Sequence, residues 1–185
     1  MSKYKPYKSI NLSDAKNVDS ILESGVLSKF LATYSDEFYG GHYIQELEKA
    51  FIEKFEVKHA ISVNSWTSGL IIAVGSLDIE PGDEIITTPW TMSATAMAIL
   101  HFNAIPIFCD IDERTYNIDV SKVEALITPR TKAILSVDIF GQSADTNQLN
   151  RIAAKHNIKV ISDTAQAITA KRDSKFAGTL TDIGG

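Results

Sequence analysis

A single acidic residue ends one of the apolar stretches of the sequence, and an amide side chain follows it three positions later. In "VISDTAQAIT" (residues 160–169) these residues are Asp163 and Gln166. Taken alone, an acid at the end of a strand is most simply explained as a helix cap or part of a turn. A metal site would need further histidine or carboxylate ligands at suitable spacing, and none is evident nearby. A second interpretation, which depends on two further segments, is that the two side chains hold two edges of a flat, charged cofactor ring.

Two further segments carry residues suited to the same ligand. "NSWTSG" (64–69) joins a predicted strand to a helix, where hydroxyls and free N–H groups at the positive end of the helix dipole attract anions. Such residues are also typical of a simple N-cap, and the nucleotide patterns GxxxxGK[ST] and GxGxxG are absent. "TPWTMSAT" (88–95) offers Trp90 and Met92, although both residue types are usually found in cores. Together the three segments indicate a phosphate at a helix N-terminus and a flat ring against Trp90 or Met92.

The elements that position these residues follow a repeated strand–helix order. The predicted strands are apolar throughout rather than alternating, which indicates burial on both faces and hence a parallel sheet covered by helices. We predict strands at 59–63, 83–88, 105–111, 132–137 and 158–163, and helices at 67–77, 91–102, 119–127 and 145–157. This is an α/β fold with a mostly parallel sheet sandwiched by helices. In open sheets of this kind, ligands bind at the carboxyl ends of the strands.

The remaining regions are predicted more coarsely. A helix at 44–57 places four apolar residues on one face, namely Ile44, Leu47, Phe51 and Phe55. The first forty residues are interpreted as an irregular arm. "EPGD" (80–83) predicts a turn, and Asp145 with Gln148 has the spacing of a helix cap. "KRDSKFAGTLTDIGG" (171–185) predicts a hairpin leading into another strand, at which the sequence stops, so we expect a fragment.

Composition restricts the class of protein. The chain has 185 residues, of which 44% are hydrophobic and 22% charged, and this suits one substantial soluble domain. A net charge of −5 disfavours nucleic acid and anionic membranes as partners. Residues 85–109 are uncharged, but Pro89 and Pro106 interrupt them, so buried strands and a helix are predicted there rather than a membrane span. Cys109 is expected to be a reduced core residue of a cytoplasmic protein, since no signal peptide is visible.

An ordered set of motifs resembles those of a known family. The segments are "VNSWTSGL", "EPGDEIITTPWT", "NAIPIFCDID", "DIFGQSAD" and "VISDTAQA". From about residue 10 onward the chain resembles the DegT/DnrJ/EryC1/StrS family of sugar aminotransferases, which use pyridoxal 5′-phosphate (PLP) and have the aspartate-aminotransferase fold (fold type I). The resemblance implies an N-terminal arm at 1–41 and a PLP-binding large domain at 42–185. It also implies that this domain is incomplete at its C-terminal end and that the small C-terminal domain is missing.

The resemblance implies a role for each candidate residue. Asp163 matches the acid that pairs with the pyridine nitrogen of PLP, and its charge keeps that nitrogen protonated. Gln166 matches the residue that hydrogen-bonds the phenolic oxygen. Trp66 and Thr67 match the phosphate-binding pair. The family often has an aromatic-Thr-aromatic pattern whose second aromatic stacks on the ring; here Met92 takes that position and Trp90 flanks the pocket.

The reaction implied by the resemblance is amino transfer, with glutamate as donor and a nucleotide-linked keto-sugar as acceptor, in a homodimer with shared active sites. The family also needs a lysine that attaches the cofactor covalently. Its expected position lies beyond Gly185, and Lys171 and Lys175 are interpreted as solvated hairpin residues. Two alternatives stay open: a sugar dehydratase of the same fold, with histidine in place of the lysine, and a cofactor-binding regulatory protein without turnover.

Overall fold

The computed structural model describes residues 12–185. The chain divides into two compact units, one ending at Ser62 and the other running from Val63 to Gly185. The boundary predicted between an arm at 1–41 and a cofactor domain at 42–185 stays a prediction.

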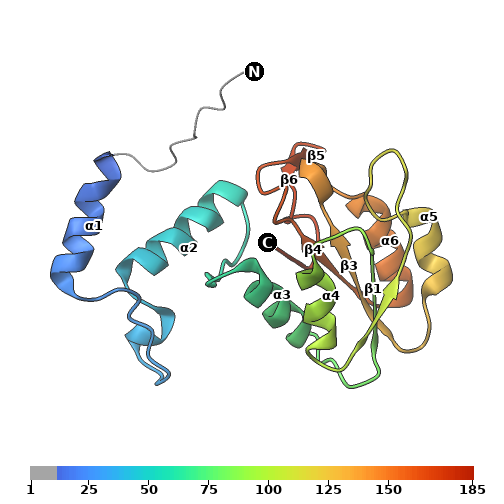
Figure 1. The fold of residues 1–185 in the computed structure, drawn as a ribbon, viewed down its shortest axis with the longest axis horizontal. Helices are drawn as coiled ribbons and strands as arrows, with labels where there is room; N and C mark the ends of the chain where they lie inside the picture. The colour runs from blue at the N-terminus through green and yellow to red at the C-terminus, as the bar shows by residue number, and fades with distance from the viewer. Residues whose placement is uncertain (1–11) are drawn as a thin grey trace, which may run out of the picture. The chain divides into compact units, whose positions relative to one another are not determined.

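The first unit is helical in its described part. Two α-helices, α1 (Leu12–Ser24) and α2 (His42–Phe55), are separated by a short 3-10 helix, η1 (Asp36–Tyr39) (Figure 1). The prediction of an irregular arm is therefore wrong over α1, where Val18 and Leu22 repeat at helical spacing until Gly25, at φ +67°, ends the helix. The part of that prediction on residues 1–11 lies outside the described residues. The predicted helix at 44–57 is confirmed as α2, although Phe55 is the only buried residue of its apolar face.

Five parallel strands form the sheet of the second unit. Their spatial order is β2-β1-β3-β4-β7, and each neighbouring pair is parallel. The strands are β1 (Glu84–Thr87), β2 (Ile105–Phe108), β3 (Thr131–Val137), β4 (Lys159–Asp163) and β7 (Ile183–Gly184). Because all of them run in one direction, their carboxyl ends share one edge of the sheet, called here the carboxyl edge, and their starts share the opposite, amino edge.

Helices cover both faces of this sheet (Figure 1). On one face lie α3 (Trp66–Gly75) and α4 (Ser93–Leu100); on the other lie α5 (Val120–Val123), the 3-10 helix η2 (Glu124–Leu126) and α6 (Thr146–His156). Ile85 of β1 and Leu135 of β3 pack in the first core, whereas their neighbours Ile86 and Ile134 pack in the second. The three central strands β1, β3 and β4 therefore contribute to both cores, which explains why their sequences are apolar throughout and confirms the predicted α/β architecture.

Two other local predictions differ in outcome. The hairpin predicted near the C-terminus is confirmed as β5 (Lys171–Arg172) paired antiparallel with β6 (Lys175–Phe176), and β7 then joins the sheet beside β4. The strand predicted at 59–63 is wrong, because this segment pairs with no strand in the described part of the chain. Ile61 is 77% exposed. A β-rich sequence forms a strand only where a neighbour accepts and donates its backbone hydrogen bonds.

The uncharged stretch at 85–109 supplies β1, α4 and β2 to this sheet and its cover. Within residues 12–185, none of the helices combines the length and apolar character that a membrane crossing needs. Cys109 is buried as predicted, and burial raises the pKa of its thiol to about 11.

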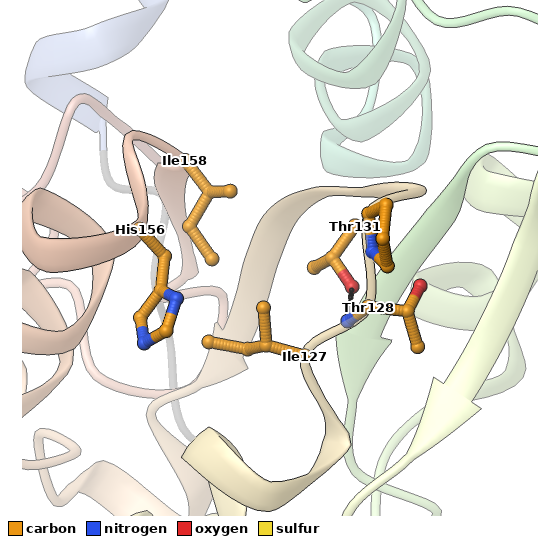
Figure 2. Close-up of a pocket in the computed structure, with 6 residues that line it drawn as sticks. Ile127, Thr128, Thr131, His156 and Ile158 are labelled. Atoms are coloured by element: carbon orange, nitrogen blue, oxygen red, sulfur yellow. Dashed lines mark hydrogen bonds between the residues drawn. The ribbon is translucent and has the colours of Figure 1, made fainter.

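A shallow pocket lies at the amino edge. Figure 2 shows Ile127 pointing toward His156 and Ile158, with Thr128 and Thr131 close to each other on the other side of Ile127. Thr128 donates its backbone N–H to the Thr131 hydroxyl at 2.9 Å. None of the residues predicted to bind the cofactor lines this pocket, and in parallel α/β sheets the chemistry belongs at the other edge.

Candidate functional site

Asp163 is the last residue of β4, and it is buried at the carboxyl edge with 5% exposure. Its Oδ1 accepts a hydrogen bond from the indole N–H of Trp66 at 2.8 Å, and its Oδ2 accepts one from the hydroxyl of Thr95 at 2.8 Å. The backbone N–H of Ala165 also points to Oδ1, at 3.4 Å. All three donors are neutral. They fix the orientation of the carboxylate without cancelling its charge.

The segment after β1 is tied to this carboxylate through two threonines. The hydroxyls of Thr91 and Thr95 lie 2.8 Å apart, one helical turn from each other at the start of α4. Thr95 is fully buried, and its hydroxyl donates a hydrogen bond to Asp163. Trp90 and Met92, which flank Thr91, are 48% and 69% exposed. The alternative that these two residues belong to the core is therefore wrong.

The start of α3 carries the groups from which "NSWTSG" was predicted to bind an anion. Ser65 is the N-cap, and its hydroxyl accepts the backbone N–H of Ser68 at 3.3 Å. The backbone N–H groups of Trp66 and Thr67 have no hydrogen-bond partner within residues 12–185, as expected for the first positions of a helix. Thr67 is exposed beside them. Two free N–H groups and a hydroxyl at the positive end of a helix suit a phosphate.

The Trp66 side chain adds a contact that the sequence did not suggest. Its indole ring spans from α3 to Asp163 and lies against the backbone of two glycines. A Cβ atom at Gly69 would come within 2.4 Å of the ring, and one at Gly185 within 2.2 Å. Only glycine fits at either position, so the ring is held in place by close packing as well as by its hydrogen bond.

Gln166 lies on the loop after β4 and is exposed. Its Oε1 accepts the backbone N–H of Phe140 at 3.0 Å. An N–H group can only donate, so this contact identifies the amide oxygen and leaves the Nε2 amino group as the free end. Gln166 therefore offers a hydrogen-bond donor next to Asp163, in keeping with its predicted partner, an anionic oxygen.

A second buried carboxylate, that of Asp138, lies next to Asp163 and is hydrogen-bonded to the segment that carries it. Asp138 directly follows β3 and is fully buried; its Oδ1 accepts the backbone N–H of Ala144 and its Oδ2 accepts the hydroxyl of Thr164, both at 2.8 Å. Its own backbone N–H donates to the carbonyl oxygen of Asp163 at 2.8 Å. Burial raises the pKa of Asp138, the bonds to Ala144 and Thr164 oppose this, and the negative charge of Asp163 raises it further.

The carboxyl edge thus carries two buried acids that no cation among residues 12–185 pairs with. Neither Asp163 nor Asp138 forms an ion pair with any residue in the described part of the chain. Burying a charge is costly unless a partner compensates it. A carboxylate has about four acceptor positions, and Asp163 uses three at most, which leaves room for one more donor. The residues of the carboxyl edge therefore fit a ligand with a positively charged N–H group.

A metal ion is a poorer fit. No group of three or more His, Cys, Asp or Glu side chains able to hold a metal ion occurs in the described part of the chain. Asp110 and Asp112 belong to a polar loop as predicted, where Asp112 accepts the backbone N–H groups of Arg114 and Thr115, both at 3.0 Å. Lys171 and Lys175 are exposed on the β5–β6 hairpin.

Comparison with known proteins agrees with the motifs. The model of the DegT/DnrJ/EryC1/StrS aminotransferase family matches residues 28–185. The chain belongs to this family. Its cofactor is PLP, and the fold of this chain is the PLP-dependent type I fold. The chain spans between 35% and 42% of the length of the curated relatives it matches.

Individual relatives narrow the kind of enzyme. The chain is 44% identical over 142 residues to a GDP-perosamine synthase from Caulobacter vibrioides, covering 77% of this chain and 38% of that protein. An aminotransferase from Psychrobacter cryohalolentis superposes with a TM-score of 0.87 at 32% identity, covering 97% of this chain and 43% of the other. An E. coli GDP-4-keto-6-deoxy-D-mannose-3-dehydratase with bound hydrated PLP superposes with a TM-score of 0.82 at 25% identity, covering 95% and 44%.

Several residues of the site were not anticipated from the sequence. Thr95, Asp138 and Thr164 all contact or support Asp163, and the indole of Trp66 does so across 97 positions of sequence. Asp138 did carry a signal, because it follows an apolar strand as Asp163 does. The pair Thr91 and Thr95 is spaced by four, as expected for one face of a helix. The Trp66 contact has no sequence signal, because it depends on how α3 and β4 pack.

Proposed function

We propose that the protein containing this chain is a PLP-dependent aminotransferase that moves an amino group, from glutamate, to a keto group on a nucleotide-linked sugar. The nucleotide-sugar relatives favour this substrate class. We further propose a homodimer in the cytoplasm, with active sites shared between subunits.

One observation carries the proposal. Asp163 is a buried anion held by three neutral donors and lacks a cationic partner within the described residues. Asp163 would hold the protonated pyridine nitrogen of PLP, which would supply the missing positive charge and N–H donor. When bound, PLP acts as an electron sink that stabilises negative charge at the carbon losing its proton. The role of Asp163 is to keep the ring nitrogen protonated, because a nearby anion favours the charged form of a base.

The other candidate residues hold the remaining edges of the ring. The free Nε2 of Gln166 would donate to the phenolic oxygen, since its Oε1 is engaged by Phe140. The N–H groups of Trp66 and Thr67, with the Thr67 hydroxyl, would bind the phosphate at the start of α3. Met92 is the more exposed of the two candidates for covering the ring face, and Trp90 would flank the pocket. We assign the covalent attachment to neither Lys171 nor Lys175.

Absorbance of the purified protein tests the proposal. We expect a visible band from bound PLP that disappears when glutamate is added and returns when a keto acid is supplied. A band that glutamate leaves unchanged would contradict amino transfer from glutamate. Absence of any band after incubation with PLP would contradict cofactor binding itself.

One alternative has a specific observation in its favour. The dehydratase structure with bound PLP superposes on 95% of this chain, so the fold described here serves both reactions. The two functions differ in their products: an aminotransferase returns an amino-sugar, whereas a dehydratase returns a deoxygenated keto-sugar. Mass spectrometry of the product therefore distinguishes them directly.

A further inference from the structure

Three aromatic side chains form an exposed cluster at the carboxyl edge. Trp90, Tyr116 and Phe140 come from the loops after β1, β2 and β3 and are 48%, 43% and 67% exposed. The rings of Trp90 and Tyr116 are 5.8 Å apart at 35°, and those of Tyr116 and Phe140 are 6.0 Å apart at 74°. These residues are called here the aromatic cluster. Large aromatic rings left open to solvent side by side are typical of a binding surface.

The backbone of the aromatic cluster is strained at two of its three members. Tyr116 has φ +61° and Phe140 has φ +54°, in the left-handed region that bulky residues rarely adopt. Glycine or asparagine would be easier to accommodate at both positions. Strain of this kind persists only where the surroundings impose it, and it concentrates at sites that hold ligands.

The loops that carry Tyr116 and Phe140 are tied to each other. The buried side chain of Asn117 accepts the backbone N–H of Ile139 at 3.2 Å and donates to the carbonyl of Gln142 at 3.2 Å. The backbone N–H of Tyr116 donates to the carbonyl of Asp112 at 2.8 Å. The aromatic rings are therefore presented on a rigid support, so a ligand would bind without the cost of ordering the loops.

The aromatic cluster is continuous with the rim of the cofactor site. The backbone N–H of Phe140 holds Gln166, which is the residue proposed to face the phenolic oxygen. On the outer side, Tyr116 lines a shallow hollow with one cation, Lys122, and with more numerous carboxylates, namely Asp110, Asp112, Glu113 and Asp119, so the charge there is negative on balance. Those charges disfavour a phosphate chain against Tyr116 but leave a neutral, planar ring unaffected.

We propose that the aromatic cluster binds the nucleobase of the nucleotide-linked sugar by stacking. The inference rests on the proposed function, which supplies a nucleotide-linked substrate, and it names the part of this chain that recognises the base. Stacking on an aromatic surface is tolerant of base identity, because every base offers a flat π-face. The aromatic cluster thereby contributes affinity for nucleotides in general.

Two glycine variants test this without disturbing the fold. Tyr116→Gly and Phe140→Gly each remove a ring at a position where glycine relieves strain, so neither is expected to unfold the protein. Phe108→Ala is the matched control, because Phe108 is an exposed aromatic residue outside the aromatic cluster. The PLP-loaded protein is titrated calorimetrically with GDP, with UDP and with inorganic pyrophosphate, which carries no base.

We expect each glycine variant to bind GDP and UDP about tenfold more weakly than the parent protein, with unchanged binding of pyrophosphate. Phe108→Ala should bind all three like the parent. Equal nucleotide affinities in all four proteins would overturn the inference, as would a parent protein that binds GDP and UDP no better than pyrophosphate. Light scattering adds a further check on the oligomeric state. If an oligomer dissociates in the glycine variants while their nucleotide affinity is unchanged, the aromatic cluster is a subunit contact and the inference of base binding is overturned.

Failure of this inference is distinguishable from failure of the proposed function. The response of the cofactor band to glutamate needs no nucleotide, so it reports on amino transfer alone. A protein that reacts with glutamate but shows no effect of the glycine variants on nucleotide binding retains the proposed function without this base site.

Discussion

The two edges of the sheet both bury carboxylates, but they neutralise them differently. At the amino edge, Glu84 is 2% exposed and forms a two-point ion pair with Arg130, and it also accepts the hydroxyl of Thr128. At the carboxyl edge, Asp163 and Asp138 are equally buried but receive only neutral donors. The first arrangement is complete within the chain. The second has no cationic partner among residues 12–185, and for that reason we propose it as the cofactor site.

The pKa directions express the same difference. The hydrogen bond from Thr128 and the pairing with Arg130 lower the pKa of Glu84, against the effect of burial. Burial raises the pKa of Asp138, and the charge of Asp163 adds to it. Pairing thus favours the ionised form of Glu84, whereas burial favours the protonated form of Asp138.

Removing the charge at the carboxyl edge should have the largest effect. In Asp163→Asn the shape is kept but the anion that maintains the protonated ring is lost. We expect the rate of amino transfer to fall by at least about a hundredfold, as for the loss of other preorganised electrostatic groups. Steady-state kinetics on the PLP-loaded variant measure this. Asp173→Asn, on the exposed hairpin, is the control and should react like the parent; normal turnover by Asp163→Asn would remove the basis of the comparison.

Removing the cation at the amino edge should lower the free energy of unfolding and leave the rate of amino transfer unchanged. Arg130→Met leaves Glu84 buried without its partner, and we expect the free energy of unfolding to fall by about 2 kcal/mol. This is below the usual range for a broken buried pair because the Arg130 side chain is 64% exposed. Chemical denaturation measures the change. Lys132→Met, which removes a looser pair to Asp83 at 3.7 Å, should cost less than about 1 kcal/mol.

The donor on Gln166 can be separated from its structural role. Gln166→Glu keeps an oxygen that can accept the N–H of Phe140 but cannot donate to the phenolic oxygen. We expect a rate about fivefold to tenfold lower, the size of one lost hydrogen bond, together with a shifted absorbance band of the bound cofactor. An unchanged spectrum and rate would show that the ring oxygen is held by another group.

The two edges should also respond to pH with opposite sign. The folded-state pKa of Glu84 is lowered, so near the ordinary pKa of a glutamate the unfolded chain binds more protons than the folded one. The stability that Glu84 contributes is therefore present above the ordinary pKa and is lost as the pH falls through the folded-state pKa. The folded-state pKa of Asp138 is raised, so its contribution is fully present below the ordinary value and is lost as the pH rises through the folded pKa.

Single variants assign these slopes. The free energy of unfolding is measured as a function of pH for the parent protein and for each variant. In the parent it should decrease as the pH falls through the folded-state pKa of Glu84, and in Glu84→Gln this decrease should be absent. In Asp138→Asn the decrease in the free energy of unfolding that sets in as the pH rises above the ordinary carboxyl pKa should be absent. The same slope in the parent and in a variant would show that another group is responsible for it.

The amino-acid sequence predicts the layers of this fold well, because neighbouring residues of a central strand face opposite sides of the sheet and both sides are buried. Ile85 and Ile86 must both be buried, and only a sheet covered on both faces achieves this. The strand at 59–63 fails the same reasoning, since apolar content does not supply a hydrogen-bonding neighbour. The helix over residues 12–24 was missed, although Val18 and Leu22 had helical spacing.

The candidate site was predictable in part. Asp163 stands out because it is polar at the end of a buried strand and Gln166 because it follows three residues later, and their proposed roles stay predictions. The contacts that orient them come from residues distant in sequence, such as the indole of Trp66 and the hydroxyl of Thr95. No periodicity or motif encodes a contact between a helix start and a strand end almost a hundred residues away. Such contacts follow only from the packed fold.

Both tryptophans of this chain, Trp66 and Trp90, lie at the carboxyl edge. The chain therefore places its strongest ultraviolet emitters where the cofactor and the base are proposed to bind. An indole whose N–H is fixed to a carboxylate and whose ring lies against two glycines has a defined orientation, and its excited state can pass energy to a nearby chromophore. The emission of these two residues makes the carboxyl edge a built-in optical probe, with Trp66 reporting on the ring of the cofactor and Trp90 on its outer rim.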